Sequence, residues 1–140
     1  MRILIDIDIE HADQLTKQLH HSGLVVESLR DGADIAERVR RTAVDAVLLG
    51  TRRAENLTTT TVTLLRISAP ETAIAVLADA SQWDAASRSA LIRGLDGTIY
   101  GGEHQVIAEE LGSLVAQRLN FCPLSASVLV CDQARQGRDC

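Results

Sequence analysis

Aromatic side chains are scarce in this sequence. They make up only 2% of the 140 residues, as Trp83, Tyr100 and Phe121. Apolar residues still account for 46% of the chain. The core must therefore be built from Ala, Val, Ile and Leu, which is typical of a sheet enclosed between layers of helices.

Long apolar runs and an excess of positive charge are missing as well. No run approaches the roughly 18 apolar residues of a membrane-spanning helix. The apolar stretch after Met1 is too short and too acidic for a secretory signal. The net charge of −5 argues against binding of nucleic acid by the chain as a whole. We expect a single cytoplasmic domain without a membrane partner, long enough to bury roughly two thirds of its unfolded surface.

Cysteine is limited to Cys122, Cys131 and Cys140, all near the carboxyl terminus. An odd number of cysteines at this spacing matches neither a disulfide framework nor a metal site of the C-x₂-C type. A reducing compartment fits this pattern best.

The stretch 44–49 is the centre of the predicted fold. It is a short apolar run, it ends at Gly50, and the polar residues 51–53 follow at once. Such a run between breakers predicts a central parallel strand that is buried on both faces. In open parallel sheets the chemistry lies just beyond the carboxyl ends of the strands. Gly50 therefore occupies a position where a reactive side chain would be expected, and it has none.

Strand-like and helix-like segments alternate along the chain. The predicted strands cover 2–9, 24–29, 44–49, 73–77 and 98–100, and the predicted helices cover 11–22, 33–41, 58–68, 83–92 and 103–119. Short connections and right-handed crossovers then predict an α/β fold, a doubly wound (βα)5 parallel sheet in the order 2-1-3-4-5. We expect one domain over residues 1–119. Residues 120–140 are expected to be a linker or tail, with a short strand at 126–131.

Several short stretches, in register along the chain, resemble the receiver (CheY-like) domain of bacterial response regulators, which has a flavodoxin-like fold. They are RILI followed by acids, SGLVVESLRDGADI, DAVLL, SAPETAIAVL and RGLDGTIY. In that family an aspartate accepts a phosphoryl group from a histidine kinase. An acidic pair holds Mg²⁺, and a hydroxyl and a lysine bind the phosphoryl oxygens, because the developing negative charge must be neutralised.

The resemblance implies that this chemistry is absent. The nucleophile position falls on Gly50, the hydroxyl position on Ala78 and the lysine position on Gly101. The acidic pair falls on Asp6 and Ile7, with Asp8 as a neighbour. The resemblance therefore implies a degenerate, aspartate-less pseudo-receiver without catalytic residues, resident metal or cofactor. We also expect Asp6 to be repelled by Asp8 and Asp79, since no bound cation separates these carboxylates.

The resemblance also implies a homodimer through the fourth predicted helix, the fifth strand and the fifth helix. The corresponding residues here are Arg88, Ile92, Arg93, Asp96, Glu103, Glu110 and Arg118. Gly97 stands where the family often has a second acid after Asp96.

The function predicted from these observations is a phosphorylation-independent module for dimerisation or protein interaction in transcription control. The alternative is a small-molecule sensor whose vacant pocket binds an effector. Arg52 and Arg53 belong either to a solvated loop or to an anion site above that pocket. Residues 129–139 resemble the start of a winged-helix (OmpR-like) DNA-binding domain, so DNA would be bound only through an output domain not present here.

Overall fold

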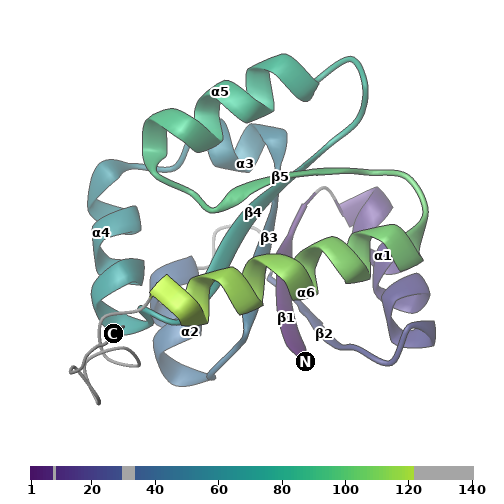
Figure 1. Ribbon diagram of the computed structural model, residues 1–140, viewed down its shortest axis with the longest axis horizontal. Coiled ribbons are helices and arrows are strands. Elements are labelled where there is room, and N and C mark those ends of the chain that lie inside the picture. The colour runs from purple at the N-terminus through teal and green to yellow at the C-terminus, as the bar shows by residue number, and fades with distance from the viewer. Residues whose placement is uncertain (8, 30–33, 122–140) are drawn as a thin grey trace.

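The computed structural model describes residues 1–7, 9–29 and 34–121 (Figure 1). The strands are β1 (Arg2–Asp6), β2 (Val25–Ser28), β3 (Ala46–Gly50), β4 (Ala73–Ala78) and β5 (Gly97–Tyr100). The helices are α1 (Ile9–His21), α2 (Ile35–Arg41), α3 (Thr51–Glu55), α4 (Thr59–Ser68), α5 (Trp83–Arg93) and α6 (His104–Phe121).

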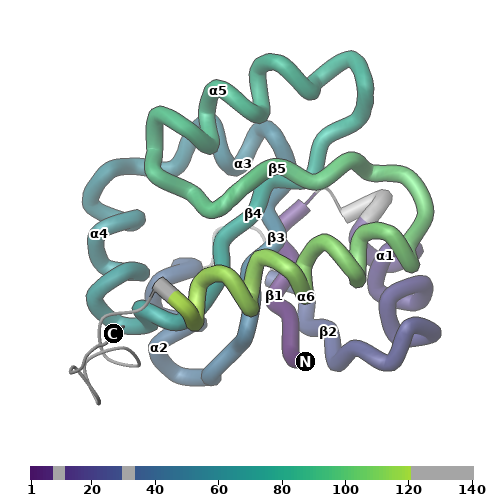
Figure 2. Tube along the Cα trace, viewed as in Figure 1, coloured from purple at the N-terminus to yellow at the C-terminus, as the bar shows by residue number. Residues whose placement is uncertain are grey.

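The strands form one parallel sheet in the order β2-β1-β3-β4-β5, which confirms the predicted topology. Alternate residues of the strands feed two apolar clusters, one on each face. One cluster packs against α2, α3, α4 and α5, and the other packs against α1 and α6. The Cα trace shows α1 and α6 side by side on their face of the sheet (Figure 2). The predicted three-layer arrangement with an aliphatic core is therefore correct.

Local hydrogen bonds explain where several helices begin and end. Asp34 caps α2 by accepting a hydrogen bond from the Ala36 backbone N–H at 3.0 Å. Thr58 caps α4 through the Thr61 N–H at 3.1 Å, as short polar side chains do at helix starts. Gly23 and Gly94 follow α1 and α5 with φ angles of 84° and 70°. They adopt the left-handed conformation that ends a helix, which glycine tolerates best.

The segment after β3 differs from the prediction. The polar residues 51–53, for which a loop is one of the predictions, belong to the helix α3 (Thr51–Glu55), which begins directly after Gly50. Thr51 and Ala54 are both buried, and residues three apart share one helix face. Burial of this face against the sheet turns a polar segment into a helix. This turn also fixes Arg52 and Arg53 beside the carboxyl edge of the sheet.

The ends of two other elements, β1 and α1, also differ from the prediction. β1 stops at Asp6 and α1 begins at Ile9, so Ile7 and Ile9 do not extend the strand as predicted. The pairing explains this, because the last partner of β1 on β3 is Leu49, opposite Asp6. The strand predicted at 126–131 lies outside the described residues, and the division at residue 119 stays a prediction. No helix in the described ranges is long and apolar enough to cross a membrane.

Candidate functional site

The register of the sheet brings the strand ends to one edge. Asp6 pairs with Leu49, Gly50 pairs with Leu77 and Ala78 pairs with Tyr100. Because all strands are parallel, the residues that follow β1, β3, β4 and β5 meet beyond this edge. This carboxyl edge is the place where the sequence positioned the vacant phosphorylation pocket.

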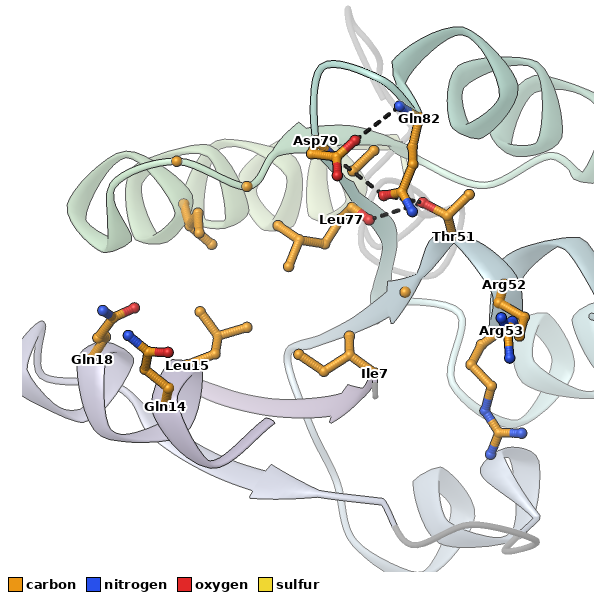
Figure 3. Close-up of a pocket in the computed structure, with 15 residues that line it drawn as sticks. Ile7, Gln14, Leu15, Gln18, Thr51, Arg52, Arg53, Leu77, Asp79 and Gln82 are labelled. Carbon is orange, nitrogen blue, oxygen red and sulfur yellow. Dashed lines mark hydrogen bonds between the residues drawn. The ribbon is translucent and has the colours of Figure 1, made fainter. Parts of the chain in front are cut away.

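A groove with a cavity volume of about 520 Å³ lies over the carboxyl edge (Figure 3). Four of the residues placed by the resemblance line it together: Ile7, Gly50, Ala78 and Gly101. The other lining residues are Gln14, Leu15, Gln18, Thr51, Arg52, Arg53, Leu77, Asp79, Gln82, Gly102 and Ile107. The groove therefore has no carboxylate at the position of the nucleophile, and no amine at the position of the lysine.

Asp6 lies on the other side of the sheet from the groove. Its carboxylate oxygen Oδ1 is 2.8 Å from Nε of Arg53. Asp6 is only 5% exposed and lines a separate cavity of about 180 Å³, together with Asp34, Asn56 and Thr61 among others. Successive residues of a strand point to opposite faces, so Asp6 and Ile7 are not a pair in space. Asp8 lies outside the described residues.

The Arg53 guanidinium thus faces Asp6, the acid at the position where the receiver resemblance places a metal ligand. A buried carboxylate requires a compensating charge, and here the protein supplies it from α3. The repulsion expected between Asp6 and its acidic neighbours stays a prediction, and the structure adds a cation that contacts Asp6 directly. In the sequence Arg53 was assigned to a solvated loop or an anion site. Only the unpredicted helix α3 brings it to Asp6.

Asp79 lies on the groove but is bound within its own loop. Its Oδ1 accepts hydrogen bonds from the Ser81 hydroxyl at 2.7 Å and from the Gln82 N–H at 2.9 Å. The Ser81 hydroxyl, helped by backbone N–H groups and opposed by desolvation, lowers the pKa of Asp79 below its ordinary value. Asp79 is therefore a fixed negative charge at neutral pH.

Thr51 and Gln82 close one side of the groove. The Thr51 hydroxyl donates to the Leu77 carbonyl oxygen at 3.2 Å and lies 3.3 Å from Oε1 of Gln82. The opposite side carries Gln14 and Gln18 from α1 (Figure 3). Sequence reasoning missed these amides, although a spacing of four residues places them on one helix face.

The backbone at Gly50 leaves little room in front of it. A Cβ atom added there would lie 3.4 Å from Cγ2 of Ile7. At Gly101 the nearest atoms to an added Cβ are the Ala78 oxygen and Leu77, both at 3.6 Å. Ile7 thus occupies the space beside Gly50 on the β1 side. At Gly101 more space remains between the backbone and Leu77.

The residues predicted for the dimer surface fall into two groups, those that are exposed to solvent and those that bind other residues of the same chain. Arg88, Ile92, Glu103 and Glu110 are exposed on α5, on α6 and just before it. The edge strand β5 runs between these two helices (Figure 1). The surface also carries apolar side chains that the sequence reasoning did not place there. They are Leu91 (82% exposed), Tyr100 (50%) and Val106 (40%), beside Ile92 itself (70%).

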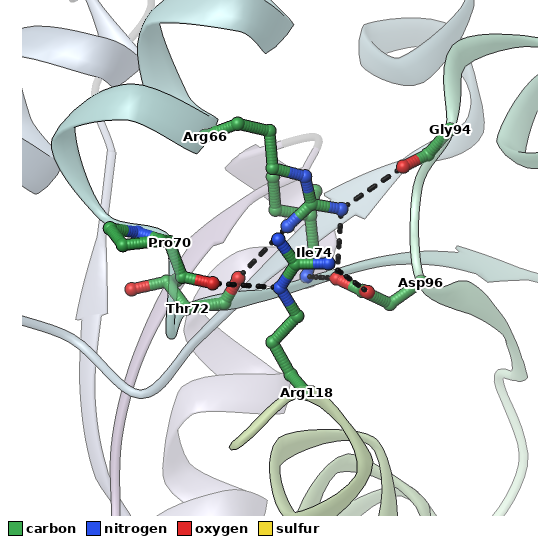
Figure 4. A network of polar contacts seen from close by, with 7 residues as sticks. All are labelled: Arg66, Pro70, Thr72, Ile74, Gly94, Asp96 and Arg118. Carbon is green, nitrogen blue, oxygen red and sulfur yellow. Dashed lines mark hydrogen bonds and ion pairs between the residues drawn. The ribbon is translucent and has the colours of Figure 1, made fainter. Parts of the chain in front are cut away.

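The remaining charged residues of that prediction bind within the chain, and Figure 4 shows two of them, Asp96 and Arg118. Asp96 accepts hydrogen bonds from Arg66 at 3.1 Å and from the Ile74 N–H at 2.7 Å, and it lies 3.7 Å from Arg118. Arg118 also donates to the Pro70 oxygen at 2.7 Å. Arg93 donates to the Leu57 and Glu55 carbonyl oxygens at 3.1 and 2.6 Å. Arg93, Asp96 and Arg118 are therefore already satisfied inside one molecule.

Gly97, which follows Asp96, has a packing reason to be small. A Cβ atom there would lie 3.3 Å from Cδ2 of Leu114 on α6. An acid at this position would be pressed against an apolar side chain.

Metal-ligating side chains do not cluster in the parts of the chain that the structure describes. Residues 1–7, 9–29 and 34–121 contain no group of three or more His, Cys, Asp or Glu side chains able to hold an ion. A hard cation such as Mg²⁺ takes several oxygen ligands. In this region Asp6 has an arginine as its neighbour instead.

Comparisons with known proteins find similarity in structure only. No protein-family model matches the sequence, and no curated protein matches it. Among solved structures, a response regulator receiver domain protein from Clostridium thermocellum has 12% identity and a TM-score of 0.66, over 84% of this chain and 95% of that chain. An adenylate cyclase from Rhodopirellula baltica has 15% identity and a TM-score of 0.65, over 85% and 90%.

A third structure comes from a family of redox sensors in the streptococci that evolved from two-component response regulators. It has 17% identity and a TM-score of 0.66, over 92% of this chain and 56% of that chain. At such identities the likeness concerns the fold and not the activity. The chain thus has the parallel five-stranded fold of response regulator receiver domains, with strand order 2-1-3-4-5.

Proposed function

We propose that the chain is a regulatory domain that works by binding and not by phosphoryl transfer. The observation that carries this proposal is the absence of a carboxylate at Gly50. The position at the end of the central strand has no carboxylate, and Ile7 packs on its β1 side. Arg53 neutralises Asp6, so the charge that would attract a metal is already compensated. The domain is then a cytoplasmic, non-enzymatic pseudo-receiver.

Incubation with acetyl phosphate and Mg²⁺, followed by intact mass measurement, tests this proposal. We expect no phosphoryl adduct on the parent chain, while an ordinary receiver domain in the same buffer becomes modified. A hydroxylamine-sensitive adduct on the parent would contradict the proposal. Its loss in Asp6→Asn would then identify Asp6 as the acceptor.

Self-association is the binding mode that the surface favours. A domain without trigger chemistry has its active state as the ground state, or a ligand selects that state. Leu91, Ile92 and Tyr100 offer exposed apolar area on α5 and β5. Buried apolar and aromatic anchors dominate interface energies, whereas exposed ion pairs contribute about 0–1 kcal/mol. We therefore propose a symmetric homodimer held by these side chains.

Sedimentation velocity at micromolar concentration tests the homodimer. The parent should sediment as a dimer without any activator, and Ile92→Glu should shift it toward monomer. Arg88→Ala is the matched control, since Arg88 is an exposed charge on the same helix, and it should have a much smaller effect. A parent that stays monomeric, or an Arg88→Ala variant as damaging as Ile92→Glu, would contradict this interface.

A second candidate function is sensing of a small molecule, and the groove of about 520 Å³ favours it. Its volume lies in the range of small-molecule sites, roughly 300–1,000 Å³. The streptococcal redox sensors offer a parallel, since that family evolved from response regulators. In either case the response would reach DNA in transcription control through an output domain outside this chain. A thermal-shift screen with metabolites separates the two candidates, because only a sensor is stabilised.

A further inference from the structure

The groove over the carboxyl edge differs chemically between its two ends (Figure 3). The amides of Gln14 and Gln18 lie at the α1 end, and Arg52 lies at the opposite end. Ile7, Leu15 and Leu77 lie between them, and Ala78 and Ile107 are further apolar residues of the lining. A molecule that fills this groove would meet an uncharged polar group, then an apolar surface, then a cation.

Arg52 is the cation available to such a molecule. Its neighbour Arg53 is already paired with Asp6 at 2.8 Å. Arg52 is exposed, and within the described ranges no hydrogen bond or ion pair holds its guanidinium. A guanidinium presents parallel N–H donors that match a carboxylate in a bidentate manner.

Asp79 limits the charge that the groove accepts. It lines the same groove, and its carboxylate stays ionised because the Ser81 hydroxyl and backbone N–H groups bind it. A fixed negative charge repels a dianion more strongly than a monoanion. Among the described residues that line the groove, Arg52 is the guanidinium without a carboxylate partner and Asp79 is the carboxylate, and this balance disfavours a phosphate ester and favours a single carboxylate.

We propose that this groove binds a small amphipathic monocarboxylate. Its apolar body lies on Ile7, Leu15 and Leu77, and its carboxylate pairs with Arg52. A polar group at the far end, where the ligand has one, meets the amides of Gln14 and Gln18. The site is the position that Gly50, Ala78 and Gly101 leave without reactive groups, so this inference rests on the second candidate function and not on the dimer.

Backbone amide NMR titrations of the full chain test the inference with four defined probes. They are hexanoate, hexanol, hexylamine and inorganic phosphate. We expect hexanoate to shift the amide resonances of Ile7, Gly50 and Gly101, with about fivefold tighter binding than hexanol, the contribution of one exposed ion pair. Hexylamine and phosphate should bind more weakly than hexanol.

Two variants assign the binding to its parts. Arg52→Gln should reduce hexanoate binding to the level of hexanol and leave hexanol unchanged. Arg41→Gln, an exposed arginine at the end of α2, is the matched control and should change neither affinity. Gly101→Leu should abolish binding of both probes, because its side chain extends beside Leu77 in the groove. Its thermal melt verifies that it is folded.

The outcomes decide the inference separately from the proposed function. Preference for hexanoate that is lost in Arg52→Gln supports it. Equal binding of hexanoate and hexanol, displacement of hexanoate by phosphate, or binding of no probe overturns it. An acetyl phosphate adduct or a monomeric parent would overturn the pseudo-receiver or its dimer instead, and neither changes the probe titrations.

Discussion

The two ends of the sheet have opposite polar chemistry. At the amino end, Asp96 binds Arg66, Arg118 and the start of β4, and the Thr72 hydroxyl donates to the Val44 oxygen at 2.8 Å. At the carboxyl end, Gly50, Ala78 and Gly101 leave an open groove. The polar side chains at the amino end therefore stabilise the fold by binding one another. The carboxyl end instead carries a groove that is accessible from solvent. The comparison teaches that this fold does not depend on the groups that a receiver uses for chemistry.

The largest effect on stability is expected for Asp96→Ala, which disrupts the polar network at the amino end of the sheet. The change removes the only carboxylate partner of Arg66 and Arg118 among the described residues, and the acceptor of the Ile74 N–H, in a place where both arginine side chains are largely buried. We expect a loss of about 3 kcal/mol in the free energy of unfolding, measured by urea denaturation. Glu103→Ala, which removes an exposed carboxylate before α6, is the control and should change stability by less than about 0.5 kcal/mol. Equal effects of the two variants would contradict the structural role of the network.

The next largest effect is expected at the Asp6–Arg53 pair. Arg53→Ala leaves a buried carboxylate without its cation and should destabilise the fold by about 1.5 kcal/mol. Because Arg53 is itself 36% exposed, the coupling energy in a double-mutant cycle with Asp6→Asn should be only about 1 kcal/mol. Arg52→Ala is the matched control and should be nearly neutral. Stabilisation of the parent by millimolar Mg²⁺ would show that Arg53 has not replaced the ion.

A pair of glycine substitutions sharpens the comparison of packing at the two ends. Gly97→Ala places a Cβ atom 3.3 Å from Leu114 and should lower stability by about 1 kcal/mol. Gly101→Ala meets no atom closer than 3.6 Å and should raise stability by about 0.5 kcal/mol, because it restricts the unfolded chain. Thermal melts of both variants measure the difference. A reversed order would contradict the tight packing of the amino end.

The smallest effect concerns Asp79 and pH. Ser81→Ala removes the main hydrogen bond that lowers the pKa of Asp79, so NMR titration should show this pKa rising toward its ordinary value. A carboxyl group with a lowered folded pKa stabilises the protein above its unfolded pKa. That stabilisation is lost as the pH falls through the folded pKa. The variant should therefore be less stable than the parent at pH values above the unfolded pKa and should converge with it in acid. An unchanged pKa of Asp79 in the variant would show that the Ser81 hydroxyl is not what lowers it.

Most of the fold could be predicted because its signals are local. The stretch 44–49 predicts a buried strand by itself, and Gly23 and Gly94 mark helix ends through their own backbone preference. The helix α3 could not be predicted in this way. It has only five residues, two of them arginines, and it forms because Ala54 is buried against the sheet.

The sequence predicted which residues of the candidate site lie at strand ends. It did not predict which charged residues pair with one another. Ile7, Gly50, Ala78 and Gly101 meet in one groove because parallel strands end at the same edge. The partners of charged residues depend on tertiary contacts far apart in sequence. Arg53 and Asp6 are 47 residues apart, and Arg118 reaches Pro70 over 48. Residues assigned to a partner surface from sequence can therefore be bound inside one molecule.

The backbone at Gly50 also bears on how this protein can evolve. With φ −69° and ψ 161°, the position lies in a region open to every L-amino acid, so one base change from a glycine to an aspartate codon meets no conformational barrier. The new carboxylate would lie on a groove shared with Arg52 and Arg53, next to Ile7. It would gain an arginine as a neighbour before any metal or lysine was present to support phosphorylation. A gain of signalling by phosphate thus requires several mutations together, and a single Gly50→Asp variant offers selection nothing to retain.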